Sequence, residues 1–340
     1  MRMERGSPVG YDANYIIEGC AGSGKTNLAL ERVNNIRIKT LAENPNAKPS
    51  FTFLVYTKAL REFIRSGAME KGISIDNIIH FAKWDKSAVD YIVVDEVQDF
   101  TKPNIDVFWK AKQKSIMFYG DTQQQVYKSY GDRMSVKEIE QYLNLPHRER
   151  ICKYRLPKSM ASLASELSRD FSLEARCKNP GTEKPKVVKL KSWKEELDYI
   201  INEIRTRNYT DVAILLPFNV PGKAHTNNQG FRNVEAVKNY FDAAGVDIQY
   251  KIRDDDSDIM ELDFDSDLPK VITYHSSKGL QFEAVFIPFC DMPHDDWTVK
   301  NFTNPLYVAL TRTYRNLYLT HTNGLSPFFS SIPKSKYDTL

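Results

Sequence analysis

The run of residues best suited to chemistry is rich in glycine and ends in a lysine and a threonine. It matches the phosphate-binding pattern G-x-x-x-x-G-K-[S/T] at every fixed position and reads Gly19-Cys20-Ala21-Gly22-Ser23-Gly24-Lys25-Thr26. Glycines let backbone N–H groups close on phosphate oxygens, and a following helix directs its positive end at the anion. We expect Lys25 to bind the β- and γ-phosphates and the Thr26 hydroxyl to coordinate Mg²⁺. The run therefore predicts a site for ATP and Mg²⁺.

An acidic pair follows a fully apolar run further along the chain. Residues 91–94 (Tyr-Ile-Val-Val) predict a buried strand that ends in Asp95 and Glu96. In open parallel sheets the ligand crevice lies at the carboxyl ends of the strands. We expect Asp95 to hold Mg²⁺ through water and Glu96 to polarise the attacking water. The alternative is a strand that ends in a solvated acidic turn, which the upstream phosphate-binding run disfavours.

Three consecutive glutamines follow the next predicted strand, residues 115–119. The segment begins Gly120-Asp121-Thr122 and continues through Gln123, Gln124 and Gln125. An amide can donate to phosphate and also accept from water. The glutamines therefore either form an ordinary polar loop or sense the γ-phosphate. Another polar segment, the acidic residues 254–267, is expected to be a solvated loop rather than a metal site.

The elements that must position these side chains alternate along the chain. Strands are predicted at residues 15–17, 51–56, 73–75, 91–94, 115–119, 150–153, 186–190, 211–216, 246–250, 270–274, 284–288 and 316–320. Helices are predicted at residues 26–38, 57–65, 135–143, 158–171, 194–205, 231–244 and 305–314, with another beginning at 78–81. This alternation predicts an α/β fold with a parallel, doubly wound sheet in each half.

Length and composition set the class of protein. A chain of 340 residues is long enough for two domains, expected at 1–147 and 148–340. Its 47 Lys and Arg against 44 Asp and Glu give a net charge of only +3, so any nucleic-acid contact must be a local basic patch. The four cysteines show no C-x-x-C spacing, which favours a reduced cytoplasmic setting over zinc or disulfides. No apolar run approaches ~18–20 residues, so we expect a soluble protein without membrane contact.

Taken in order, the motifs resemble those of the UvrD/Rep-like superfamily 1 helicases. The likeness covers nearly the whole chain. After the glycine-rich run, the matching segments are Tyr56-Thr57-Lys58-Ala59, Ile79-His80-Phe81, Val94-Asp95-Glu96-Val97-Gln98-Asp99, Gly120 to Tyr127, Tyr154-Arg155-x-Pro157, Thr273 to Phe282 and Tyr307 to Arg312. One such match is weak evidence, whereas a full set in family order leaves little room for coincidence.

The resemblance implies two RecA-like domains with a P-loop NTPase site in the cleft between them. It implies that Gln124 contacts the γ-phosphate and that Tyr154 packs on adenine. It implies arginine fingers at Arg155 and Arg312, which neutralise charge on the transferring phosphoryl group when the domains close. It also places Gly279 and Gln281 at the nucleotide.

The resemblance further implies contacts to a nucleic-acid strand. The candidates are Thr57, Lys58, His80, Tyr127, Tyr130 and His275. Hydroxyls and imidazoles can bond to phosphates, and tyrosine rings can stack on bases. For each of these residues the alternative is ordinary packing or a satisfied polar group in the core.

The sequence departs from the family pattern in several places. Residues 1–15 contain no glutamine for the adenine-reading motif, and Gln281 stands where the family has a ribose-binding glutamate. Ser129 replaces an expected aromatic, with Tyr130 beside it. The spacing of the motifs leaves no room for the family's large insertions. The chain is therefore expected to be a bare two-domain motor.

These observations favour an ATP-dependent DNA helicase or translocase that moves 3′ to 5′ on single-stranded DNA, with RNA left open. A second reading is an ATPase switch subunit of a nucleic-acid-processing or genome-defence complex, with a partner such as a nuclease or a homo-oligomer. A third, a metabolic P-loop kinase, leaves the motifs that contain Arg155 and Arg312 unexplained.

Overall fold

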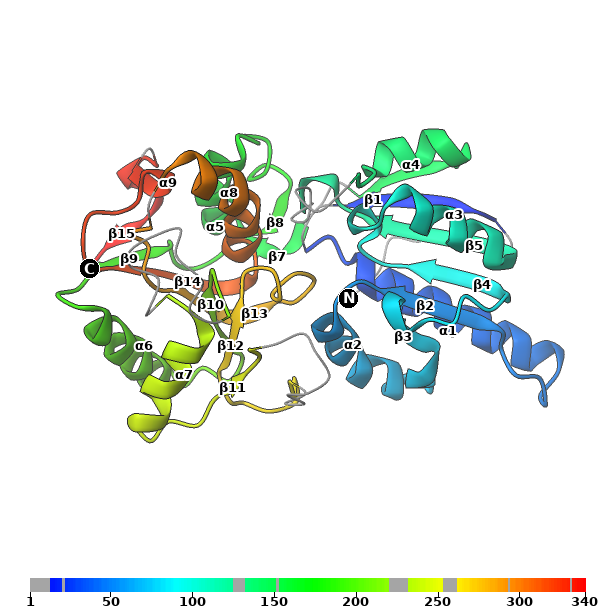
Figure 1. Ribbon diagram of the computed structural model, residues 1–340, viewed down its shortest axis with the longest axis horizontal. Helices are drawn as coiled ribbons and strands as arrows, with labels where there is room; N and C mark the ends of the chain where they lie inside the picture. The colour runs from blue at the N-terminus through cyan, green and yellow to red at the C-terminus, as the bar shows by residue number, and fades with distance from the viewer. Residues whose placement is uncertain are drawn as a thin grey trace. The chain divides into compact units, whose positions relative to one another are not determined.

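The chain folds into two compact units in the computed structural model (Figure 1). The structure describes residues 13–19, 22–124, 132–150, 153–219, 232–252, 262–292, 294–330 and 332–340. Unit 1 comprises Met1–Cys20 and Gly24–Arg150, and unit 2 comprises Ala21–Ser23 and Ile151–Leu340. Four of the predicted site residues, Cys20, Ala21, Tyr127 and Tyr130, lie outside the described residues.

Unit 1 is built on a six-stranded sheet in which every strand pair is parallel. The order is β3-β2-β4-β5-β1-β6. The strands are β1 (Tyr15–Gly19), β2 (Phe51–Val55), β3 (Ile78–His80), β4 (Val89–Val94), β5 (Lys112–Gly120) and β6 (His147–Arg150). Because β5 lies between β4 and β1, the three predicted site segments that follow these strands emerge side by side at one edge.

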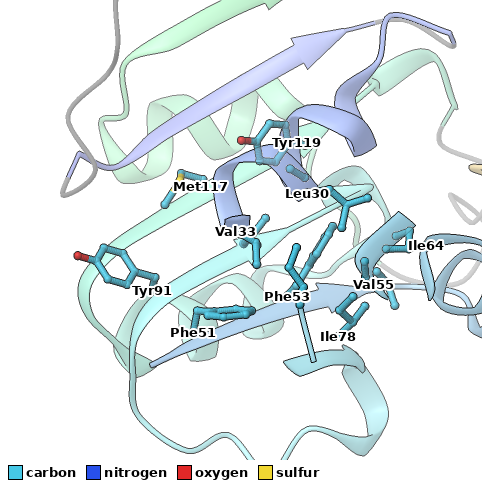
Figure 2. Packing of buried hydrophobic residues seen from close by; sticks show 14 of the residues in the cluster. Leu30, Val33, Phe51, Phe53, Val55, Ile64, Ile78, Tyr91, Met117 and Tyr119 are labelled. Atoms are coloured by element: carbon cyan, nitrogen blue, oxygen red, sulfur yellow. The ribbon is translucent and has the colours of Figure 1, made fainter. Parts of the chain in front are cut away.

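Helices cover both faces of this sheet. They are α1 (Lys25–Glu43), α2 (Lys58–Glu70), α3 (Lys102–Ala111) and α4 (Val136–Leu143). Alternate strand residues pack in opposite directions: Phe53 and Val93 join a cluster with α1 and α2, shown in Figure 2, whereas Leu54 and Val94 join a cluster with α3 and α4. Strands buried on both faces are what a doubly wound sheet requires.

Unit 2 has a seven-stranded, wholly parallel sheet in the order β11-β12-β10-β13-β14-β9-β15. The strands are β9 (Lys186–Lys189), β10 (Val212–Leu216), β11 (Gln249–Tyr250), β12 (Lys270–Thr273), β13 (Phe282–Ile287), β14 (Thr313–His321) and β15 (Asp338–Thr339). A separate two-stranded sheet pairs β7 (Lys153–Pro157) with β8 (Cys177–Asn179).

The helices of unit 2 also sit on two faces. α6 (Trp193–Arg207) and α7 (Val234–Ala243) share a buried cluster with Ile214 and Phe286 of the sheet. Residues of the opposite parity, such as Leu215 and Val285, are equally buried. α5 (Lys158–Ser168) packs against α8 (Asp296–Leu310). Short elements complete the chain: α9 (Pro327–Ser330) and the 3-10 turns η1 (Ile75–Asn77), η2 (Phe81–Lys83), η3 (Val97–Asp99), η4 (Thr122–Gln124) and η6 (Lys334–Lys336).

The parallel α/β fold in each half is confirmed, and some local predictions are wrong. The strand predicted at 73–75 is absent, because Gly72, at φ 65°, ends α2 and the Ile73 N–H bonds back to the Ala68 carbonyl. Of the residues expected to begin a helix, 78–81, the first three instead form β3 beside β2, and Phe81 begins the 3-10 turn η2. Of the strand predicted at 150–153, the structure describes only the ends: Arg150 closes β6, which pairs with β1, and Lys153 opens β7. Among the described residues, no helix has the length and apolar content needed to cross a bilayer.

Candidate functional site

The glycine-rich run connects β1 to α1. β1 ends at Gly19, and α1 begins after Gly24, whose φ of 85° lies in the left-handed region that favours glycine. Because its N-cap is glycine, α1 receives no side-chain acceptor for its first N–H groups, which suits an anion. The Ser23 hydroxyl is buried without a hydrogen bond among the described residues, and the buried Lys25 ammonium donates to the Gly19 carbonyl. These features fit a triphosphate.

Thr26 and Asp95 meet although 69 positions separate them in the chain. The Thr26 Oγ1 donates to Asp95 Oδ2 at 2.7 Å, and the Glu96 N–H donates to Asp95 Oδ1 at 2.9 Å. Asp95 is fully buried directly after β4. Burial and the neighbouring Glu96 carboxylate raise the pKa of Asp95 to about 6, partly offset by the Thr26 hydrogen bond and by Lys25. A cation at these oxygens would favour the ionised carboxylate.

A chain of side-chain hydrogen bonds leads from Glu96 to Gln124. Gln98 Nε2 donates to Glu96 Oε2 at 2.6 Å, and Gln98 Oε1 accepts from the Asp121 N–H at 3.0 Å. Gln124 Nε2 then donates to Asp121 Oδ2 at 2.5 Å. All four residues are buried. The two residues predicted to polarise water and to contact the γ-phosphate are therefore linked through Gln98 and Asp121.

Backbone geometry supports this series of hydrogen bonds at two residues. Glu96 itself adopts a left-handed conformation, with φ 53°, which a non-glycine residue holds only at a cost of ~1–3 kcal/mol. Gly120, the last residue of β5, lies so close to Gln98 that a Cβ atom there would stand 2.7 Å from Gln98 Oε1. A side chain at position 120 would therefore collide with Gln98, which lies in the middle of the hydrogen-bonded series.

Three predicted nucleic-acid contacts lie together on unit 1. Thr57 and Lys58 follow β2, and His80 ends β3, where it pairs with Val55 of β2. Thr57 Oγ1 caps α2 by accepting from the Leu60 N–H at 3.1 Å, and His80 Nδ1 accepts from the Ala82 N–H at 3.3 Å. These bonds use acceptor sites and leave the Thr57 hydroxyl hydrogen for a phosphate oxygen. The fourth candidate, His275, follows β12 in unit 2 and is partly buried.

In unit 2, Arg155 lies on β7 next to the exposed ring of Tyr154. The Arg155 Nη1 donates to the side-chain Oε1 of Gln281 at 2.9 Å. Gln281 is nearly buried directly before β13. The glutamine that replaces the expected glutamate therefore holds the guanidinium by a hydrogen bond to a neutral amide rather than by an ion pair.

Arg312 is held differently, since its guanidinium is buried and donates to acceptors of its own unit. They include the Val308 carbonyl at 2.9 Å, the Leu280 carbonyl at 3.3 Å and the Thr311 hydroxyl at 3.2 Å. Gly279 lies in the same stretch as Leu280, with φ 80°. Arg312 thus fastens the end of α8 to the segment that contains Gly279 and Gln281.

Two family models of helicases match this chain. The family model for the viral superfamily 1 RNA helicase core domain matches residues 15–216, more than half of the chain. A second, for the UvrD-like helicase C-terminal domain, matches residues 270–320. The chain belongs to the superfamily 1 helicases. The RecA-like α/β fold and a nucleotide-hydrolysing activity follow from this membership.

Solved structures similar to this helicase share little sequence with it. The C-terminal domain of a possible DNA helicase from Lactobacillus plantarum is 16% identical, with a TM-score of 0.38, and covers 55% of this chain and 99% of its own. Arterivirus nonstructural protein 10, a helicase solved with DNA, is 17% identical with a TM-score of 0.43 and covers 91% and 61%. The PRRSV helicase is 13% identical with a TM-score of 0.46 and covers 91% and 52%. No curated protein matches the helicase in sequence.

The donor set of this helicase suits Mg²⁺. The Thr26 hydroxyl and the Asp95 carboxylate are hard oxygen ligands at hydrogen-bond distance from each other. Mg²⁺ keeps several waters and takes one or two protein ligands beside phosphate, so it needs no larger cage. The described residues contain no group of three or more His, Cys, Asp or Glu placed to hold a metal.

Sequence patterns missed several residues that build the site. Gln98 and Asp121 stand inside recognised motifs, but only the fold reveals that they join Glu96 to Gln124. Glu18, on β1, accepts from the Thr122 hydroxyl at 2.8 Å and so ties the base of the phosphate loop to the segment after β5. The sequence did contain a signal for Glu18, because it is an acidic residue in an otherwise apolar strand.

Proposed function

We propose that this protein is an ATP-dependent helicase or translocase of the UvrD/Rep-like type that moves on single-stranded DNA. The observation that carries the proposal is the meeting of Thr26 with Asp95 at 2.7 Å, at the start of the helix that contains Lys25. This is the arrangement that a Mg²⁺-bound triphosphate requires of a P-loop protein. The 3′ to 5′ direction is part of the proposal and comes from the motif resemblance.

In the proposed reaction, unit 1 binds the nucleotide and prepares the attacking water. The N–H groups at the start of α1 and the Lys25 ammonium bind phosphate oxygens, while Thr26 and Asp95 hold the cation. When bound, Mg²⁺ neutralises negative charge on the β- and γ-phosphate oxygens. Glu96 accepts a hydrogen bond from the water and orients it towards the γ-phosphorus. Gln124 adds an amide donor to the γ-phosphate.

Unit 2 supplies the remaining positive charge in this proposal. Arg155 and Arg312 bond to the γ-phosphoryl group as charge develops on it. Tyr154 packs against adenine, and Gln281, next to Gly279, bonds to the nucleotide. Loss of the γ-phosphate removes the group that both units bind, so hydrolysis alters how they hold a strand.

The nucleic-acid contacts are proposed at Thr57, Lys58 and His80 of unit 1 and at His275 of unit 2, with Tyr127 and Tyr130 as stacking residues. Hydroxyl, ammonium and imidazole groups suit backbone phosphates, which is how a motor reads a strand without reading its sequence. A basic patch of this kind binds more weakly as salt rises.

The test is the ATPase rate of the whole chain with single- and double-stranded DNA and RNA, together with displacement of a labelled strand. We expect severalfold stimulation by single-stranded DNA. Lys25→Ala is expected to remove nucleotide binding, whereas Glu96→Gln is expected to keep binding and lose at least about 10²-fold in turnover. A rate that is the same with and without every nucleic acid would refute the translocase.

A second candidate is an ATPase switch subunit that gates a partner, such as a nuclease or another copy of the chain. The observation that favours it is the short segment between two motifs of unit 1. Between Lys58 and Asp95 lie only α2, β3, β4 and two 3-10 turns. Strand-stimulated hydrolysis without displacement of a labelled strand, together with a co-purifying protein, would favour this candidate.

A further inference from the structure

Asn179, the last residue of β8, holds together two segments of unit 2 that are far apart in sequence. Its Nδ2 donates to the Arg155 carbonyl at 2.7 Å and to the Tyr314 carbonyl at 3.2 Å. Its Oδ1 accepts from the Gly181 N–H at 3.1 Å. An amide has two N–H donors and one carbonyl acceptor, so every polar group of this side chain is used.

The two carbonyls belong to the segments with the proposed arginine fingers. Arg155 supplies one of them directly, and Tyr314 lies two residues after Arg312 at the start of β14. Asn179 belongs to none of the helicase motifs. It therefore joins the backbone of one arginine segment to the backbone of the other through a residue that no motif identifies.

Other hydrogen bonds close this link into a ring. The Arg155 side chain donates to Gln281, and the next residue, Phe282, donates its N–H to the Arg312 carbonyl at 2.9 Å. The covalent chain from Arg312 to Tyr314 and the Asn179 amide complete the circuit. Within this ring, Asn179 supplies the hydrogen bonds that join the two arginine segments on the Tyr314 side.

The local strand pairing explains why a side chain is needed here. β7 and β8 pair at Lys153 with Cys177 and at Pro157 with Asn179, and the register shifts between these two points. Arg155 lies in the irregular part, where the regular ladder is interrupted. The Asn179 amide supplies a donor to its carbonyl at that point, which fixes the strand that presents the guanidinium.

We propose that Asn179 is a positioning residue that sets the spacing of Arg155 and Arg312, an inference that rests on the proposed function. Arginines that act on a transferring phosphoryl group must be placed closely, since a misplacement of about 1 Å can cost about 10²-fold in rate. Asn179 acts through the arginines and not on the nucleotide itself. Its loss should therefore lower kcat and leave the KM for ATP almost unchanged.

The experiment compares Asn179→Ala and Asn179→Asp with the wild type in strand-stimulated ATPase assays. Asp keeps the shape but replaces the donor with an acceptor facing two carbonyls. We expect kcat to fall about 10-fold in Asn179→Ala and at least as far in Asn179→Asp, with KM within about twofold. Ser159→Ala is the matched control, because it removes one side-chain bond in the same region, from Ser159 Oγ to the Glu183 carbonyl at 2.7 Å. Its kcat should stay within about twofold of wild type.

A double-mutant cycle with Arg155→Ala separates positioning from general loosening. If Asn179 acts through the arginine, adding Asn179→Ala to Arg155→Ala should lower kcat further by much less than it does alone. Full additivity, or a wild-type kcat in Asn179→Asp, would overturn the inference. If nucleic acid does not stimulate hydrolysis by the wild-type chain, the proposed function is refuted instead. If Arg155→Ala turns over normally, the proposed role of Arg155 is refuted. These failures can therefore be distinguished from a failure of the inference about Asn179.

Discussion

The two units hold their proposed ATP-site residues in different ways. In unit 1, carboxylates accept from neighbouring side chains: Thr26 donates to Asp95, Gln98 to Glu96, and Gln124 to Asp121. In unit 2, the arginines donate to neutral acceptors, which are carbonyls and the Thr311 hydroxyl for Arg312 and the Gln281 amide for Arg155. In the proposed function, the carboxylates of unit 1 hold the cation, and the arginines of unit 2 exchange protein acceptors for phosphate oxygens. We propose that the first arrangement serves binding and the second serves the switching of hydrolysis.

The largest expected effect comes from the arginines. Arg155→Ala and Arg312→Ala should each lower kcat by about 10²–10³-fold, because each removes charge stabilisation from the transferring phosphoryl group. Their effects on stability should differ. Arg312→Ala removes the guanidinium donor of the buried Leu280 carbonyl and should cost about 2–3 kcal/mol, whereas Arg155→Ala loses one partly exposed bond and should cost less than about 1.5 kcal/mol. Steady-state kinetics and urea unfolding measure the two quantities. Equal destabilisation by both would contradict the contrast between the two arginines.

A smaller effect is expected from Gly120→Ala, which tests the side-chain network of unit 1. The added methyl would stand 2.7 Å from Gln98 Oε1 and 2.8 Å from Val97 Cγ1, so Gln98 must move away from Glu96 and Asp121. We expect a loss of about 1–3 kcal/mol in stability and of about 10-fold in kcat, with nucleotide affinity retained. The control is Gly324→Ala, since among the described residues no atom beyond the two chain neighbours lies within 4 Å of a Cβ at that position. Normal turnover in Gly120→Ala would show that the link between Glu96 and Gln124 is dispensable.

The smallest effect concerns the pH dependence of stability in the absence of Mg²⁺. The pKa of Asp95 is raised from 3.8 to about 6 in the folded chain, chiefly by burial. The folded state therefore binds more protons than the unfolded state between these values, so the free energy of unfolding falls as pH rises through this window. Asp95→Asn removes this pH-dependent fall in the free energy of unfolding, so the variant should be more stable than wild type at pH 7 by about 1–3 kcal/mol. The same variant should lose activity. Urea unfolding in EDTA from pH 4 to 7 measures it, with the exposed Asp132→Asn as control. A less stable Asp95→Asn chain at pH 7 would contradict the assignment.

Much of the fold was predictable because its signals are local. The fully apolar run 91–94 identified β4 and the acidic residues after it, and the glycine-rich run identified the turn from β1 into α1. The helix α3, from Lys102 to Ala111, was not predicted, although a capping box of Thr101 and Asn104 begins it. The strand expected at 73–75 failed because Ile73 closes the end of α2 instead of pairing.

The candidate site was predictable only where a motif states the chemistry. The roles of Lys25, Thr26 and Asp95 were predictable from residue type and spacing. The role of Gly120 comes from how close Gln98 approaches it, and the role of Asn179 comes from two carbonyls 24 and 135 positions away. Such contacts depend on how strands are arranged side by side, and no local pattern in the sequence carries that information.

The central claim is that arginines of unit 2 act on a phosphoryl group bound by unit 1. The most direct measurement is the affinity for ADP with aluminium fluoride and Mg²⁺, a mimic of the transferring phosphoryl group, in the presence of single-stranded DNA. We predict that Arg155→Ala and Arg312→Ala weaken this complex by about 10²-fold while the affinity for ADP alone stays within about twofold of wild type. Unchanged affinity for the aluminium fluoride complex in both variants would contradict the account.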